Sequence, residues 1–171
     1  MKKLLVVVDM QNDFVGGALG SVEAQRILPE VNQKIAEAEL VVYTLDTHFE
    51  DYLSTQEGKN LPVVHCIKGT WGHELAEGLL VREDGKRIEK PTFGSVELGE
   101  YVKELYTGGR ISGVELVGVC TDICVISNAL LIKAYCPELT VSVAAHSCAG
   151  VTPESHENAL KTMASCQIKL L

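Results

Sequence analysis

The sequence has little positive charge and no long apolar run. Lys and Arg number 15 against 23 Asp and Glu, which gives a formal net charge of −8. This balance disfavours binding to a phosphate backbone, because few cations are available to displace its counterions. The apolar run Leu4–Val8 near the N-terminus ends at Asp9. Since a signal-peptide core takes about 7–15 apolar residues and a membrane span about 20, we expect a cytoplasmic protein with no nucleic-acid or membrane partner.

The sequence also lacks a Cys-x-x-Cys pair, an internal repeat and a linker rich in Pro, Gly or Ser. Its six cysteines are therefore expected to be free thiols, most of them small core residues. The length of 171 residues and the hydrophobic fraction of 46% are usual for one globular domain, here taken as residues 1–171.

Short β-branched runs alternate with helical patterns along the chain. Runs such as LLVVV and LVVYTL are apolar throughout, which is typical of parallel strands covered on both faces. The alternation predicts an α/β fold, a three-layer α/β/α sandwich. The expected strands are Leu4–Val8, Leu40–Leu45, Val63–His65, Arg87–Glu89, Leu116–Val119, Leu139–Ala145 and a short one in Gln167–Leu170; the expected helices are Ala24–Ala38, Leu98–Tyr106, Asp122–Tyr135 and Pro153–Cys166.

Polar or reactive residues come directly after several of these strands. In a parallel sheet, ligands bind beyond the carboxyl ends of the strands, so residues in this position are candidates for one common site. They are Asp9, Asp46, His48, His65, Lys90, Cys120 and Cys124.

Cys124 is the candidate nucleophile among the six cysteines. With Thr121 as the expected N-cap, Cys124 is the third residue of the helix that follows the strand Leu116–Val119. Free amide N–H groups and the helix dipole at such a position favour a thiolate and lower the pKa of the thiol. The alternative is that Cys124 packs in the core like the other five.

Asp9 and Lys90 each allow two interpretations. Asp9 ends a buried strand, where a carboxylate is unfavourable unless it is paired or functional, but it also fits a capping residue in a turn with Asn12 and Asp13. Lys90, taken alone, fits an ordinary solvated surface lysine.

Asp46 and His48 are two residues apart, so in an extended segment their side chains point to the same side. His65, expected at the end of a neighbouring strand, adds a second imidazole. Two histidines and a carboxylate form a familiar open site for zinc or iron. The alternative is a hydrogen-bonded Asp–His pair beside a core histidine.

Four sequence blocks together resemble the isochorismatase-like cysteine hydrolases, and within them the nicotinamidases. The blocks are VVVDMQNDF at residues 6–14; DTH at 46–48 with HCIKGT at 65–70; KPTFGS at 90–95; and GVCTDICV at 118–125 with SCAGVTPESHENAL at 147–160. They extend over nearly the whole chain in the family's order.

The resemblance implies a six-stranded, mostly parallel sheet and a catalytic triad of Asp9, Lys90 and Cys124. It also implies a non-proline cis peptide bond between Val119 and Cys120. This bond would turn the Cys120 N–H, together with that of Cys124, towards the reacting carbonyl as an oxyanion hole. Isochorismatases proper lack the cysteine, so Cys124 favours an amide substrate.

The metal set of Asp46, His48 and His65 is typical of nicotinamidases and generally missing from amidases of carbamoyl or ureido compounds. The chain departs from the nicotinamidases in two ways: no further histidine follows the Asp-x-His pair, and no aromatic residue directly precedes His65. Glu57, in a polar loop that Gly58 allows to turn tightly, is the candidate replacement ligand. The alternative is a solvated glutamate of that loop.

The expected ring-binding residues are Phe14 and Trp71, and the expected metal is zinc, with iron as the alternative. The resulting hypothesis is a nicotinamidase that hydrolyses a small amide through a thioester on Cys124, with a dimer or tetramer expected. A metal-free amidase for carbamoyl or ureido compounds is one alternative. A non-catalytic metal- or redox-sensing module is another, although such a module has no need of a lysine beside the thiol.

Overall fold

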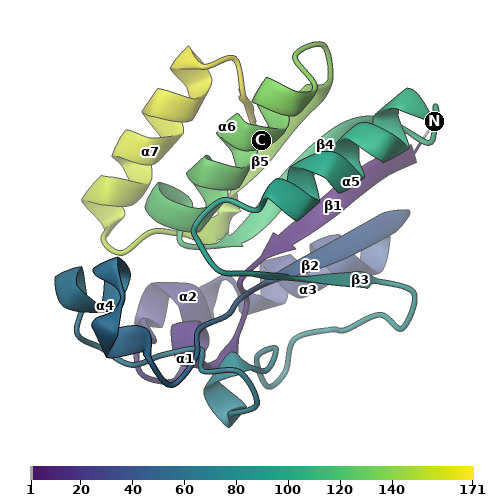
Figure 1. The fold of residues 1–171 in the computed structure, drawn as a ribbon. Helices are drawn as coiled ribbons and strands as arrows, with labels where there is room; N and C mark the ends of the chain where they lie inside the picture. The colour runs from purple at the N-terminus through teal and green to yellow at the C-terminus, as the bar shows by residue number, and fades with distance from the viewer. Residues whose placement is uncertain (1) are drawn as a thin grey trace.

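All six strands of the central sheet run parallel, in the order β3-β2-β1-β4-β5-β6. The computed structural model describes residues 2–171, and Figure 1 shows helices on both faces of the sheet. The strands are β1 Lys2–Val8, β2 Leu40–Asp46, β3 Lys86–Lys90, β4 Ile111–Val119, β5 Thr140–Ala149 and β6 Lys169–Leu170. The predicted three-layer α/β/α architecture with a six-stranded parallel sheet is confirmed.

The α-helices of the described residues are α1 Asn12–Val15, α2 Val22–Arg26, α3 Leu28–Glu37, α4 Gln56–Asn60, α5 Val96–Thr107, α6 Ile126–Tyr135 and α7 Pro153–Ser165. All but α4 form two layers. Figure 1 shows α5, α6 and α7 over one face of the sheet and α1, α2 and α3 under the other. No helix in residues 2–171 is long and apolar enough to cross a membrane.

Alternate residues of β1 supply the two halves of the core, because successive side chains of a strand point to opposite faces. Leu4, Val6 and Val8 pack with the α5–α7 layer. Leu5 and Val7 pack with the α2–α3 layer. This two-sided burial explains why the strand sequences are apolar throughout.

The chain order of the strands reverses between β1 and β4. From β1 the chain continues through β2 to β3 on one side, and from β4 through β5 to β6 on the other. The carboxyl ends of β1 and β4 therefore flank the crevice in which parallel sheets bind ligands. Gly118 in β4 allows the two strands to meet: its φ is 113°, and a Cβ there would lie 2.2 Å from the Val8 carbonyl oxygen.

The predicted strand Val63–His65 is wrong, since this segment is irregular. Its bonds are local or to side chains instead of to another strand: the Val63 N–H donates to the Leu61 carbonyl at 2.8 Å, and two further bonds, one of them from the adjoining Cys66, involve side chains. The Val63 carbonyl contacts His65 Nδ1 at 2.7 Å, and the Cys66 N–H donates to Asp13 Oδ2 at 2.7 Å.

Two predicted helices also differ from those observed. The predicted helix Ala24–Ala38 is divided into α2 and α3, which meet at Ile27, with Pro29 in the first turn of α3. The predicted helix Asp122–Tyr135 begins as a turn of π-helix, Thr121–Val125. Thr121 is not the N-cap: Cys120 holds that position without a side-chain cap, and the Thr121 hydroxyl bonds His156 Nδ1 at 2.8 Å.

Candidate active site and metal centre

The Lys90 ammonium contacts both of the other candidate catalytic side chains, Asp9 and Cys124. Lys90 Nζ lies 2.6 Å from Asp9 Oδ2 and 3.4 Å from Cys124 Sγ. The side chains of Lys90 and Asp9 are completely buried. Although burial alone lowers the pKa of Lys90, the charges of Asp9, Cys124 and Asp46 outweigh it and raise that pKa. Lys90 is therefore a buried cation and not a surface lysine.

Asp9 is held in a fixed position at the end of β1. Its φ is 48°, a conformation that non-glycine residues seldom adopt. The Thr44 hydroxyl donates to Asp9 Oδ1 at 2.6 Å, and the Asp9 N–H donates to the Thr44 carbonyl at 3.2 Å. Burial raises the pKa of the Asp9 carboxyl, and Lys90 offsets only part of that effect. A carboxylate with a raised pKa is a stronger base than an ordinary one.

Cys124 lies within the π-helical turn that follows β4. The peptide bond between Val119 and Cys120 is cis, as predicted. Asn128 of α6 holds this turn in place. Its side-chain amide donates to the Cys124 carbonyl at 2.8 Å and accepts from the Ser95 N–H at 2.9 Å. Asn128 thus links the turn that carries Cys124, the candidate nucleophile, to the start of α5.

The expectation of a lowered pKa for Cys124 is wrong for the protein without substrate. Burial raises the pKa of the Cys124 thiol well above its ordinary value, the Asp9 carboxylate raises it further, and Lys90 opposes them only in part. Desolvation of the thiolate and the charge of the nearby Asp9 carboxylate raise this pKa more than the backbone N–H groups at the start of the helix lower it.

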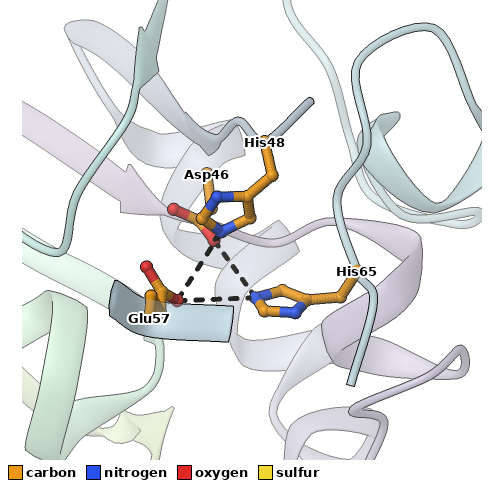
Figure 2. A group of neighbouring side chains, drawn as sticks. All are labelled: Asp46, His48, Glu57 and His65. Atoms are coloured by element: carbon orange, nitrogen blue, oxygen red, sulfur yellow. Dashed lines mark hydrogen bonds and ion pairs between the residues drawn. The ribbon is translucent and has the colours of Figure 1, made fainter. Parts of the chain in front are cut away.

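Figure 2 shows four further side chains that converge on one point, and one of them, Asp46, contacts Lys90 Nζ at 3.2 Å. They are Asp46 at the end of β2, His48 just beyond it, Glu57 of α4 and His65 of the following irregular segment, and their potential ligand atoms all lie within 4.8 Å of one another. His48 Nε2 is 2.9 Å from Asp46 Oδ2, and His65 Nε2 is 3.5 Å from the same oxygen. Two imidazoles and two carboxylates in this arrangement fit a four-coordinate zinc ion or a similar divalent metal.

The surroundings orient these side chains as in known metal sites. His65 directs Nδ1 to the Val63 carbonyl, which leaves Nε2 for a metal, and such outer hydrogen bonds are usual for ligating histidines. The Tyr52 ring packs against the rings of His48 and His65, with centroids 4.7 and 5.0 Å away. Burial raises the pKa of Asp46, but hydrogen bonds from His48 and His65 and the Lys90 charge outweigh it and lower that pKa, so the carboxylate is ionised.

Glu57 is in the cluster as predicted, but the local structure differs from the prediction. It lies in helix α4 and not in a loop, and Thr55 caps that helix by accepting from the Gly58 N–H at 3.0 Å. Gly58 is needed for close approach and not for a turn, because a Cβ there would lie 2.0 Å from the Tyr52 carbonyl oxygen. Glu57 Oε1 lies 3.6 Å from His48 Nε2.

A cavity of about 470 Å³ opens onto Cys124 and onto three members of the possible metal cluster, Asp46, Glu57 and His65. Cys120, Cys124, Asp46, Glu57 and His65 supply polar or reactive groups to its wall. The rest is mainly apolar and includes Phe14, Leu19, Leu61, Phe93, Ile123 and Val151. This size and lining suit a small apolar molecule oriented by a few polar groups.

The structure places Phe14, but not Trp71, at the cavity. Phe14 comes from α1, and its ring packs edge-on against His65 with centroids 5.6 Å apart. Trp71 is about half exposed, and its indole N–H donates to Glu77 at 2.9 Å.

Sequence reasoning missed Gln11, which accepts from the Asp46 N–H at 2.7 Å and donates to the Asp46 carbonyl at 2.9 Å. Its place beside Asp9 in DMQNDF was the available signal.

Comparisons with known proteins match nearly the whole chain. The model of the isochorismatase domain matches residues 3–171. The crystal structure of Pyrococcus horikoshii pyrazinamidase in complex with zinc has a TM-score of 0.84 and 33% identity, and the match covers 100% of this chain and 99% of that one. The Bacillus subtilis isochorismatase family protein PncA, described as uncharacterized, is 32% identical over 96% of each chain. The Schizosaccharomyces pombe nicotinamidase is 28% identical over 98% of this chain and 91% of its own.

Proposed function

This chain belongs to the isochorismatase family and is a hydrolase of amide C–N bonds, and we propose that it is a nicotinamidase that converts nicotinamide to nicotinate and ammonia. The observation that carries the proposal is the buried contact of one ammonium, Lys90 Nζ, with both Asp9 at 2.6 Å and Cys124 at 3.4 Å. A positioned base, a thiol and a cation that stabilises both anions are what covalent amide hydrolysis requires.

In the first half of the reaction, Asp9 takes the proton of the Cys124 thiol as the sulfur attacks the amide carbon. Lys90 stabilises the developing thiolate, and the N–H groups of Cys120 and Cys124 hold the oxyanion. The C–N bond then breaks, Asp9 returns the proton to the leaving nitrogen, and ammonia departs. A thioester on Cys124 remains.

In the second half, Asp9 takes a proton from a water molecule that attacks the thioester carbon. The C–S bond breaks, the proton passes to the Cys124 sulfur, and the carboxylic acid leaves. Because the raised pKa of Asp9 makes it a stronger base than a solvated carboxylate, the same group serves both halves.

A zinc or iron ion held by Asp46, His48, His65 and Glu57 would supply a Lewis-acid position for the ring nitrogen of the substrate. The chain itself contributes an apolar wall, on which Phe14 faces the cavity next to His65. Together they would orient the amide towards Cys124, and such positioning is worth several kcal/mol.

The proposal is tested by measuring ammonia release from a panel of small amides. Nicotinamide should be hydrolysed well, and benzamide, which has the same ring size without the nitrogen, should be hydrolysed poorly. Preference for carbamoyl or ureido compounds, with activity that survives chelation, would instead support a metal-free amidase. No hydrolysis of any amide by the metal-loaded protein would contradict the proposal.

A further inference from the structure

The two oxygens of the Asp46 carboxylate face two different parts of the site. Oδ1 lies 3.2 Å from Lys90 Nζ. Oδ2 lies 2.9 Å from His48 Nε2 and 3.5 Å from His65 Nε2. One buried carboxylate therefore contacts both the proposed metal ligands and the cation that contacts the nucleophile.

The backbone keeps Asp46 in this bridging position. Asp46 and Lys90 are register partners in the adjacent strands β2 and β3, so their side chains start from neighbouring points. Gln11 bonds both the N–H and the carbonyl of Asp46, at 2.7 and 2.9 Å. The end of β2 is therefore held by β3 on one side and by Gln11 on the other. A shift of the main chain that would separate the Asp46 carboxylate from Lys90 or from the histidines would break these bonds.

Lys90 divides its interactions among three acidic groups and the Thr92 carbonyl, which accepts from Nζ at 3.2 Å. Its side chain is completely buried, and besides Asp46 it contacts Asp9 and Cys124, at 2.6 and 3.4 Å. Charges that water does not screen interact strongly at such distances. Whatever neutralises Asp46 therefore changes how much of the Lys90 charge is available to Asp9 and Cys124.

We propose that Asp46 is a positioning residue that couples the metal centre to the nucleophile through Lys90. A divalent ion at Oδ2 attracts the Asp46 charge, and Lys90 is then held more by Asp9 and Cys124. This inference rests on the proposed metal site but not on the identity of the substrate. Because coupling is reciprocal, a change of charge beside Lys90 must in turn change the affinity for the metal.

The test measures zinc affinity in variants of two residues that are not metal ligands, by competition with a chromophoric chelator. Lys90→Met removes the cation that competes for Asp46 and should bind zinc at least about fivefold more tightly, a usual size for coupling between sites. Asp9→Asn frees Lys90 to interact with Asp46 and should bind zinc more weakly. Lys68→Met is the matched control, because Lys68 is exposed and pairs with Glu89; its zinc affinity should equal that of the wild type.

Opposite shifts in the two variants are the expected result, because mere loosening of the site would weaken zinc binding in both. If Lys90→Met does not fold, the double variant Asp9→Asn/Lys90→Met removes the buried pair as a unit and should bind zinc more tightly than Asp9→Asn.

Zinc binding with unchanged affinities, or with both variants weakened, overturns the coupling and leaves the proposed amidase intact. Absence of zinc binding by the wild type overturns the metal site and the coupling together. Failure to hydrolyse nicotinamide, with opposite shifts observed, overturns only the proposed substrate.

Discussion

The Lys90 ammonium and the Asp9 carboxylate lie 2.6 Å apart with both side chains completely buried. The two residues are far apart in the sequence, and the pair forms because β1 and β3 lie on either side of β2 in the sheet. Removing one partner of a buried ion pair leaves an uncompensated charge, so each member depends on the other for its ionisation.

The first prediction concerns this pair. Asp9→Asn and Lys90→Ala should each lower kcat for amide hydrolysis at least about a hundredfold, the usual effect of a positioned proton-transfer group. Lys68→Ala removes an exposed lysine and should keep full activity. Steady-state ammonia release gives the comparison, and a loss of less than tenfold in both triad variants would rule out their proposed roles.

The second prediction concerns the pH dependence of Cys124 reactivity. Burial, and then the Asp9 carboxylate, raise the pKa of this thiol, so the thiolate fraction at neutral pH is small and grows as the pH rises. Labelling of Cys124 by iodoacetamide should therefore keep accelerating above pH ~8.5, the pKa of an ordinary cysteine. Peptide mapping follows the rate, with the exposed Cys166 as an internal reference. A rate that levels off below neutral pH would show that the thiol is activated without substrate.

The third prediction concerns the metal. His48→Ala and His65→Ala should each lose most of the bound metal, because each removes a buried imidazole from the cluster. Glu57→Ala should lose part of it, since Glu57 lies at the more open side of the site, with its side chain 21% exposed. Metal loss should raise KM for nicotinamide. Elemental analysis of protein purified without chelators is the measurement, and a wild-type content far below one metal per chain would favour the metal-free alternative.

The fourth prediction concerns the contact between β1 and β4. Gly118→Ala combines a positive φ with a Cβ 2.2 Å from the Val8 carbonyl oxygen, and should lower the free energy of unfolding by about 2–5 kcal/mol. Gly16→Ala is the control, because a Cβ there meets nothing within 4 Å and the φ of Gly16 is −135°. Urea denaturation distinguishes them; equal midpoints would mean that the strands separate easily.

The sheet was predictable because most of its strands are recognisable from their own sequences. The apolar runs of β1, β2 and β4 indicate burial on both faces, and the residues that follow them are the ones that meet at the site. Val63–His65 misled because a β-branched pair before a histidine looks like a strand. The Val63 carbonyl contacts the His65 ring, and the N–H of the adjoining Cys66 donates to Asp13, a partner too distant in sequence for a local pattern to reveal.

Within the site, the sequence predicted which residues meet better than it predicted how their surroundings change their pKa values. Asp46, His48 and His65 follow from spacing and resemblance, but the raised pKa of Cys124 depends on the burial of its thiol and on the Asp9 carboxylate beside it. Trp71 was expected at the substrate because no aromatic residue directly precedes His65. Its indole N–H instead donates to Glu77 at the surface, and the sequence alone does not indicate which way this short 3-10 helix turns the ring.

Replacing the Cys124 sulfur tests whether this residue is the nucleophile of a nicotinamide hydrolase. Nicotinate formation from nicotinamide is followed for the wild type and for Cys124→Ala, with the fold of each verified by circular dichroism. The wild type should show steady turnover and Cys124→Ala none above background, because no thioester can form without the sulfur. A folded Cys124→Ala protein that keeps a substantial part of the wild-type rate would contradict this role of the sulfur.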